Sequence, residues 1–361
     1  MNVLIYNGNG TSINSVKHTY NTLKSLLGHA YDVMKVDALT LRNEPWEETC
    51  SLLVIPGGRD TPYCEELNHQ KIKSYVQGGG NYLGLCAGAY YASREIEFEL
   101  GTPLAIQGPR PLGFFPGLCH GTVYPGFVYN SEKGARSVSI LAGTKEIKTY
   151  YNGGGYFTGA AADKVICVYQ DNNQPAGVLC HVQKGRALLF GVHPEYDIRD
   201  VDLSENENAQ TISKELAASL SDCRKLLSDS LAQLGLKVGE SDLPRLTPIY
   251  LSAVKREVSD AIKANMLKEA DDQNILKDSN DQFLIQEEDN LEDSIKTLSI
   301  DKPLLKIICT DKAHTPFFNT RKYYESLLQR RSQEWGGGAW YHMGNAMLYS
   351  EVITSTQTVL D

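Results

Sequence analysis

The chain has 361 residues, 42% of them hydrophobic and 22% charged, and a formal net charge of −9 at pH 7. This length and composition are typical of a soluble globular α/β protein with more than one domain, and they exclude the fibrous and low-complexity classes. Because about 18 apolar residues never occur in succession and no basic leader precedes the first apolar run, we expect a cytoplasmic protein without a membrane segment.

The first hundred residues alternate short apolar runs with helical patterns. This rhythm of strand, helix and strand predicts a mainly parallel sheet flanked by helices, with right-handed crossovers. In such sheets, functional sites gather at the carboxyl ends of the strands. The expected strands are residues 3–6, 31–36, 52–56 and 81–85, and the expected helices are residues 16–27 and 65–76.

Residues 100–193 form glycine-punctuated, strand-like pieces that suit an antiparallel extension of the sheet. Within them, "HVQKGRALLF" predicts a hairpin that turns at Lys184-Gly185. The segment "NGGGYF", residues 152–157, is interpreted as a flexible hairpin, with the alternative that it lines the crevice at the sheet edge. A helix over residues 209–234, with its leucines on one face, would close the domain.

Acidic residues gather in one region, because ten of them lie between residues 269 and 293 against Lys277 alone. Elsewhere the charges are balanced and no basic stripe occurs, so we expect no nucleic-acid partner. Residues 257–300 are interpreted as a solvated, poorly ordered linker, with loosely packed helices as the alternative. The predicted organisation is a domain over residues 1–238, a connection with the acidic linker over 239–300, and a further segment over 301–361.

Eight cysteines are spread singly along the chain without CxxC pairs, which argues against a zinc site, any other metal site and a disulfide scaffold. Cys86 stands apart, because "GLCAG" places it between two glycines, after a predicted strand and before a helix-like stretch. Such a turn lifts a thiol above the sheet edge, and the amides of the following helix favour its thiolate. We expect the others to be small packing residues: Cys50, Cys64, Cys119, Cys167, Cys180, Cys223 and Cys309.

Two further predicted strands end in groups that a thiol nucleophile needs. "VIPGGRD" ends in Gly57 and Gly58, whose amides could form part of an oxyanion hole with that of Ala87. "GVHPEYD" ends in His193 and Glu195, two residues apart, so that an imidazole and a carboxylate project to one side. Each feature alone has an ordinary explanation, as a βα turn, a buried histidine or a surface acid. Together, at strand ends, they predict a Cys-His-Glu site.

From these motifs, residues 1 to about 235 resemble the class I glutamine amidotransferase fold, which is flavodoxin-like. The resemblance implies that Cys86 attacks a glutamine side-chain amide, that His193 is general base and acid and is oriented by Glu195, and that backbone amides bind the oxyanion. Two departures stand out. Ala89, Tyr90 and Tyr91 occupy the place where family glutaminases have a polar, glutamine-binding pair, and no synthetase domain accompanies the motifs to receive ammonia.

A second resemblance covers nearly the whole chain. "NVLIYNGNGTSINSVKHTYNTL", "FFPGLCHG", "GFVYNSEKGAR" and "TYYNGGGYF" are similar to the amino-terminal region of fungal biotin protein ligases. "PFFNTRKYYESL" and "GNAMLYSEVITSTQTVLD" resemble the entry to the ligase catalytic domain, where Ser355 and Thr356 would belong to an incomplete biotin site. Because the Gly-Arg-rich and K-W-P-N-D motifs of that domain are absent, we expect a truncated ligase.

The ligase resemblance implies cofactors and partners for the parent enzyme only. That enzyme would use ATP, magnesium and biotin to form biotinyl-AMP and would biotinylate carboxylase lysines, whereas the fragment itself is expected to need no cofactor. Its partners would be the catalytic domain in cis and the biotin-accepting carboxylase domains. Three functional readings remain open at this point: a regulatory or interaction domain of the ligase, an active thiol amidase or glutaminase, and a stress-type hydrolase or thiol sensor.

Overall fold

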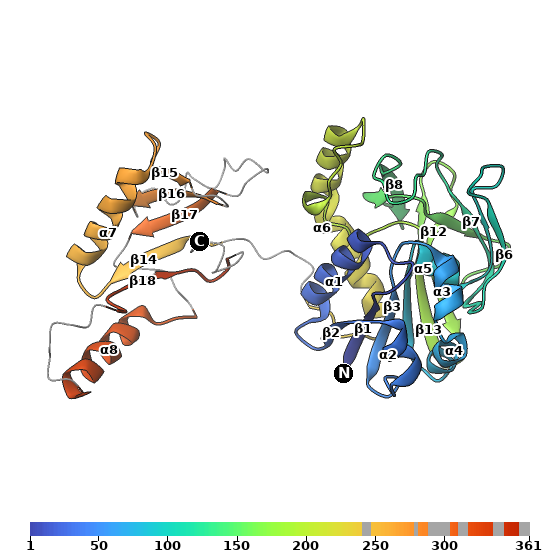
Figure 1. Ribbon diagram of the computed structural model, residues 1–361, viewed down its shortest axis with the longest axis horizontal. Helices are drawn as coiled ribbons and strands as arrows, with labels where there is room; N and C mark the ends of the chain where they lie inside the picture. The colour runs from blue at the N-terminus through green and yellow to red at the C-terminus, as the bar shows by residue number, and fades with distance from the viewer. Residues whose placement is uncertain (240–246, 278–280, 288–303, 310–316, 335–342, 354–361) are drawn as a thin grey trace. The chain divides into compact units, whose positions relative to one another are not determined.

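The computed structural model describes residues 1–239, 247–277, 281–287, 304–309, 317–334 and 343–353 (Figure 1). The chain divides into two compact units, Met1–Leu243 and Pro244–Asp361. Each unit has its own sheet and its own apolar core.

The first unit alternates helices and strands up to β4 and is mostly β-structure from there to a long final helix. Its helices are α1 (Ile13–Leu27), α2 (Ala38–Asn43), α3 (Asp60–Glu66), α4 (His69–Gln77), α5 (Ala87–Ala92) and α6 (Ala209–Gln233), with a 3₁₀ turn at Ile198–Asp200. Its strands are β1 (Asn2–Tyr6), β2 (Asp32–Val36), β3 (Cys50–Ile55), β4 (Asn81–Leu85), β5 (Ser93–Phe98), β6 (Ile106–Pro109), β7 (Phe115–Gly121), β8 (Arg136–Ala142), β9 (Lys145–Tyr151), β10 (Gly155–Thr158), β11 (Lys164–Tyr169), β12 (Pro175–Val182) and β13 (Gly185–Phe190).

The large sheet of this unit has the order β2-β1-β3-β4-β13-β12-β11-β8-β9. Neighbours from β2 to β13 are parallel, and those from β13 to β9 are antiparallel. The predicted α/β sheet is therefore confirmed, and its antiparallel extension is confirmed for β8, β9, β11 and β12, whereas β6, β7 and β10 belong to a second sheet. The predicted hairpin is also confirmed, because β12 and β13 pair antiparallel, but its turn lies at Gln183-Lys184, one residue earlier than expected, since Gly185 already pairs with Val182.

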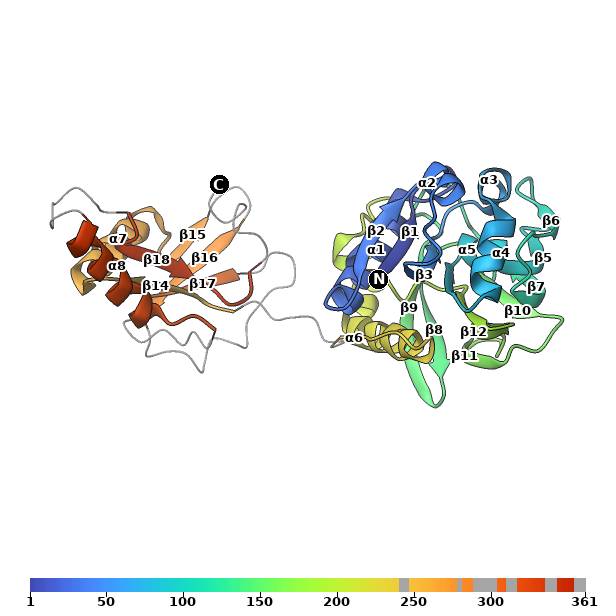
Figure 2. The same ribbon diagram turned by 90° about the horizontal axis from the view of Figure 1, so that it is seen from below.

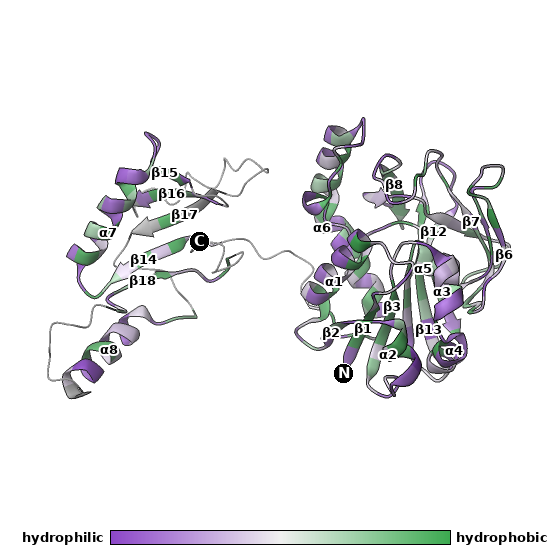
Figure 3. Cartoon of the chain, viewed as in Figure 1, coloured by the Kyte–Doolittle hydropathy of each residue, from purple (hydrophilic) through white to green (hydrophobic). Residues whose placement is uncertain are grey.

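Helices cover both faces of the sheet, so its central strands are apolar on both sides. In β3, Leu53 and Ile55 pack into the core under α3, α4 and α5, whereas Leu52 and Val54 pack into the core under α1 and α6. Figures 1 and 2 show α1 and α6 on the side away from α3 and α4. In Figure 3 the central strands are green, while the surrounding helices carry purple stretches.

A second sheet of the first unit has the order β10-β7-β5-β6, and β5 follows α5 directly. Here the structure differs from the hairpin expected at 152–157. β9 belongs to the large sheet, whereas β10 pairs antiparallel with β7, so the glycines between them carry the chain from one sheet to the other.

The helix expected over residues 65–76 is also wrong in detail, because the chain forms two helices there. α3 ends at Glu66, and α4 begins at His69 after Asn68. The Asn68 side chain accepts a hydrogen bond from the Lys71 amide at 3.1 Å. This N-cap satisfies a free amide and starts a new helix, which the apolar spacing alone does not reveal.

The second unit has a sheet of order β15-β16-β17-β14-β18. Its elements are β14 (Ile249–Ala253), α7 (Arg256–Glu269), β15 (Ile275–Lys277), β16 (Gln282–Glu287), β17 (Leu304–Cys309), α8 (Thr320–Glu334) and β18 (Ala346–Tyr349). Part of the expected linker at 257–300 thus folds into α7, β15 and β16. The reason is that Phe283, within the acidic stretch, packs into an apolar core with Ile249, Leu251 and Ile307. No helix in the described parts of the chain is long and apolar enough to span a membrane.

Candidate active site

Cys86 occupies a sharp turn between β4 and α5. Its backbone has φ 49° and ψ −103°, a left-handed conformation that costs a non-glycine residue on the order of 1–3 kcal/mol. The Cys86 amide donates to the Phe190 carbonyl of β13 at 2.8 Å, which ties the turn to the neighbouring strand. The turn is thus a nucleophile elbow in its geometry.

The two flanking glycines allow backbone contacts that no other residue permits. A Cβ on Gly88 would lie 1.9 Å from the Ile55 carbonyl oxygen of β3. A Cβ on Gly84 would lie 2.5 Å from the carbonyl oxygen of Gly88 itself. The turn therefore requires glycine on both sides of Cys86 because α5 packs directly against the strand backbone.

His193 and Glu195 follow β13, the strand next to β4. The His193 Nδ1–H donates to the Glu195 Oε1 at 2.7 Å, and the two residues are only 4% and 1% exposed. The His193 amide donates to the Tyr150 carbonyl at 2.9 Å, which fixes the segment against β9. Burial alone would lower the pKa of His193, but the charge of Glu195 and the hydrogen bonds to Cys86 and Glu195 raise it.

The structure brings Cys86, His193 and Gly57 around one point. A Cβ on Gly57 would lie 2.8 Å from the His193 Cε1 and 3.5 Å from the Cys86 Cβ. The Cys86 thiol donates to the Asn152 carbonyl at 3.8 Å. A raised histidine pKa beside a thiol favours the imidazolium form, which stabilises a thiolate.

Of the three amides predicted for an oxyanion hole, one is otherwise used. The Gly57 amide donates to the Ser15 Oγ at 2.8 Å, so this prediction is wrong for Gly57. Gly58 has φ 150°, and a Cβ there would lie 2.0 Å from the Gly10 carbonyl oxygen. Gly58 and Ala87 both line the cavity at Cys86 and remain the candidate donors.

A cavity of about 850 Å³ opens at Cys86 and His193. The segment between β9 and β10 supplies Asn152 and Gly153 to its lining, so the alternative expectation, that this segment lines the crevice, holds. Of the two tyrosines after the elbow, only Tyr90 reaches the cavity, and its hydroxyl donates to the Gly153 carbonyl at 3.2 Å. Tyr91 is fully buried elsewhere and bonds to the His69 Nδ1 at 2.7 Å.

Glu132 holds the loop over residues 126–135 against the cavity. Its carboxylate accepts hydrogen bonds from the Tyr150 hydroxyl, from the Asn152 Nδ2 at 3.2 Å and from the Asn14 Nδ2 at 3.2 Å. Asn152 in turn presents the carbonyl that the Cys86 thiol contacts. Sequence reasoning missed Glu132, because nothing in the local pattern around it points to the elbow, whereas Asn152 belongs to the segment that the alternative expectation places along the crevice.

A second buried histidine lies behind the carboxylate of the site. The Asp197 amide donates to the His18 Nδ1 at 3.2 Å, and the His18 ring stacks on Tyr196 at 4.3 Å. From the same face of α1, the Thr22 Oγ1 donates to the Glu195 carbonyl at 2.8 Å. α1 therefore fixes the loop that carries His193 and Glu195, and burial lowers the pKa of His18.

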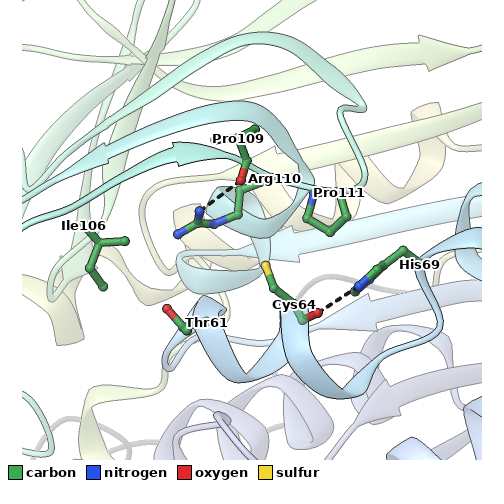
Figure 4. Close-up of a pocket in the computed structure, with 7 residues that line it drawn as sticks. All are labelled: Thr61, Cys64, His69, Ile106, Pro109, Arg110 and Pro111. Carbon is green, nitrogen blue, oxygen red and sulfur yellow. Dashed lines mark hydrogen bonds between the residues drawn. The ribbon is translucent and has the colours of Figure 1, made fainter.

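A smaller cavity of about 480 Å³ lies beside α3 and is lined by Thr61, Cys64, His69 and Arg110, among others (Figure 4). Arg110 forms an ion pair with Asp60, which lines the larger cavity. Burial raises the pKa of Cys64 to about 11, so this thiol stays protonated. Burial likewise raises the thiol pKa of Cys50, Cys119, Cys167, Cys180 and Cys223, in keeping with packing roles.

Two predicted binding residues, Ser355 and Thr356, lie outside the described residues. The side chain of Cys309 is likewise not described. Within the described ranges, no group of three or more histidine, cysteine, aspartate or glutamate side chains could hold a metal ion.

Comparison with known proteins places the chain in a family. A model of the family described as "Biotin-protein ligase, N terminal" matches residues 1–253. A biotin–protein ligase of Schizosaccharomyces pombe is 34% identical over 393 residues, covering 100% of this chain and 59% of that protein. A biotin–protein ligase of Homo sapiens is 21% identical over 376 residues, covering 100% of this chain and 44% of that protein. The chain thus spans about half the length of these two ligases.

A third relative is shorter. A Chlamydia muridarum protein described as uncharacterized is 36% identical over 207 residues, which cover 54% of this chain and 80% of that protein. The match therefore covers most of the Chlamydia protein but only about half of this chain.

The close contact at Gly88 predicts a large effect of one methyl group. Gly88→Ala should lower the free energy of unfolding of the first unit by about 2 kcal/mol or more, because Ile55 and α5 must move apart. Gly78→Ala is the matched control, since Gly78 has an ordinary helical φ of −73° and its nearest atom would be 3.1 Å away. Urea unfolding of both variants measures the difference, and equal stabilities would contradict the packing described.

The raised pKa of His193 predicts how the reactivity of Cys86 depends on pH. Because the charge of Glu195 raises that pKa, Glu195→Gln should lower it, leave less imidazolium at neutral pH and slow alkylation of Cys86 by iodoacetamide at pH 7. As pH rises, the wild type should keep the imidazolium to higher pH than the variant.

The measurement is the alkylation rate from pH 5 to 10, with the rate of Cys86→Ser subtracted. Glu215→Gln, which removes a half-buried acid whose Oε2 lies 3.9 Å from the Lys148 Nζ, serves as the control and should leave the profile unchanged. Identical profiles for wild type and Glu195→Gln would show that the carboxylate does not act on the imidazole.

Proposed function

The chain belongs to the biotin-protein ligase family, and on this premise we propose that it is the N-terminal regulatory or interaction part of such a ligase, with a thiol acyl-transfer site at Cys86. The parent protein would biotinylate carboxylase lysines through biotinyl-AMP, with ATP, magnesium and biotin as its reactants and cofactors. Its catalytic domain, in cis, would be the partner of the part described here. Ser355 and Thr356 would contribute to the biotin site, and no step of that reaction is assigned to the described residues.

The single observation that supports an active site is the buried His193–Glu195 pair beside a strained cysteine. A cysteine with a positive φ has a strained backbone, and such strain clusters at sites where function requires that geometry. The buried 2.7 Å hydrogen bond orients the imidazole, and the cavity gives a substrate access to the thiol. A packing cysteine, such as Cys64 with its raised pKa, has none of these features.

The proposed reaction is cleavage of an amide. The Cys86 thiolate attacks the carbonyl carbon, and the oxyanion that forms accepts hydrogen bonds from the amides of Gly58 and Ala87. The C–N bond breaks as the His193 imidazolium protonates the leaving amine, which leaves a thioester on Cys86. Water, deprotonated by His193, then attacks the thioester, and the carboxylic acid and the free thiol are released.

Ammonia release tests the amidase. We expect the protein to release ammonia from glutamine or from uncharged primary carboxamides, and we expect Cys86→Ala to abolish the release. Cys64→Ala removes a second thiol from the same unit and should keep the wild-type rate. Equal rates in wild type and Cys86→Ala would exclude the amidase and leave a regulatory domain with an inactive site.

The regulatory role is tested in the whole ligase. A ligase that lacks residues 1–238 should biotinylate its carboxylase acceptor at a rate different from that of the intact ligase under the same biotin and ATP concentrations. Unchanged rates over a range of acceptor concentrations would contradict a regulatory or interaction role.

A further inference from the structure

One wall of the cavity at Cys86 is aromatic. Tyr90 comes from α5, Phe98 from β5, and Phe127 and Tyr129 from the loop that Glu132 holds. The ring centroids of Tyr90 and Phe98 lie 5.6 Å apart, those of Phe98 and Phe127 also 5.6 Å, and those of Phe127 and Tyr129 4.8 Å. These separations are typical of edge-to-face packing, so the rings form one continuous apolar surface beside the thiol.

The charged groups inside the cavity are already engaged. The Asp60 carboxylate is paired with Arg110, and both side chains are about nine-tenths buried. The Glu132 carboxylate accepts from Tyr150, Asn152 and Asn14. Because both carboxylates already have partners, neither is free to bind a cationic ligand. Their negative charge also repels an anionic ligand.

The only interior cation that the described lining residues supply is the His193 imidazolium, which is already paired with Glu195. Among the described lining residues, Arg59 is the single lysine or arginine, and it is exposed at the rim. Two exposed acids, Asp202 and Glu205, belong to the same lining. A free amino acid such as glutamine carries a carboxylate that a cation would stabilise, and the described interior offers only the His193 imidazolium, which is already paired with Glu195.

The size of the cavity fits a larger ligand than glutamine. A volume of about 850 Å³ lies in the range that encloses drug-sized molecules. An amino acid held at Cys86 would leave the aromatic wall in contact with water. A ligand with an apolar tail would instead cover that wall and gain the free energy of burying both surfaces.

We propose that this site takes an uncharged carboxamide or thioester whose acyl group carries an apolar tail of ring size or longer, with the carbonyl at Cys86 and the tail on Phe98, Phe127 and Tyr129. The assignment rests on the proposed acyl-transfer function and names its substrate class. With a thioester substrate, the C–S bond breaks in place of C–N, and the thiol leaves with the proton from His193.

The test uses probes that need a reactive thiol and no turnover. Three N-substituted iodoacetamides carry tails of equal length that end in a phenyl ring, a carboxylate or an ammonium group. In each case the Cys86 sulfur forms a bond to the CH₂ carbon and iodide leaves. The rate of labelling at rising probe concentration separates the binding constant KI from the maximal rate.

The phenyl probe should saturate with a KI about tenfold below those of the charged probes, because its ring is buried on the aromatic wall. Phe127→Ala should raise that KI several-fold with the maximal rate unchanged, and Phe127→Leu should restore most of the binding. Phe317→Ala removes an exposed ring of the second unit and is the matched control. Thermal unfolding of each variant shows that the fold is retained.

Two results would overturn the proposal. Equal KI values for the three probes would show that the wall does not select a tail. The lowest KI for the carboxylate probe, raised by Arg59→Ala, would show a site for an amino acid. If the protein releases no ammonia from any amide but still binds the phenyl probe most tightly, the amidase function is excluded, whereas the proposed ligand class is retained.

Discussion

The direct contact between the α5 backbone and the β3 backbone determines the rest of the site. Because a Cβ on Gly88 would lie 1.9 Å from the Ile55 carbonyl oxygen, the helix can approach this closely only with glycine at that position. This approach forces the chain to turn within one residue, and Cys86 adopts the left-handed conformation that lifts its thiol to the sheet edge. His193, Gly57 and the cavity are arranged around that thiol, so the site keeps its geometry only while the α5–β3 contact is present.

The sequence predicts the part of the site that lies at strand ends. Cys86 and Gly58 follow strands of the βαβ pattern, whose carboxyl ends meet at one edge of the sheet, so their proximity follows from that pattern. His193 follows β13, a strand expected in the antiparallel extension, and it reaches the same edge because β13 pairs parallel with β4. Ser15, Glu132 and Asn152 could not be predicted in this way. They act through hydrogen bonds between segments far apart in the chain, and it is such a bond, from the Gly57 amide to Ser15, that removes one predicted oxyanion donor.

The same distinction applies to the fold. The parallel strands, α6 and the β12–β13 hairpin follow from periodicity and turn chemistry, which are local. The break between α3 and α4 depends on a single side-chain cap at Asn68. The transfer of the chain between sheets before β10 and the folding of part of the acidic stretch depend on partners elsewhere, on β7 in one case and on Ile307 in the other.

The glycines at positions 57 and 58 have a consequence for how the site responds to substitution. Their missing Cβ atoms leave room for the His193 ring, for the Ser15 hydroxyl of α1 and for the Gly10 carbonyl. A single methyl group at either position would therefore displace a neighbour of the thiol or the loop beside it. The site is thus sensitive to the smallest enlargement at two residues whose side chains take no part in the chemistry.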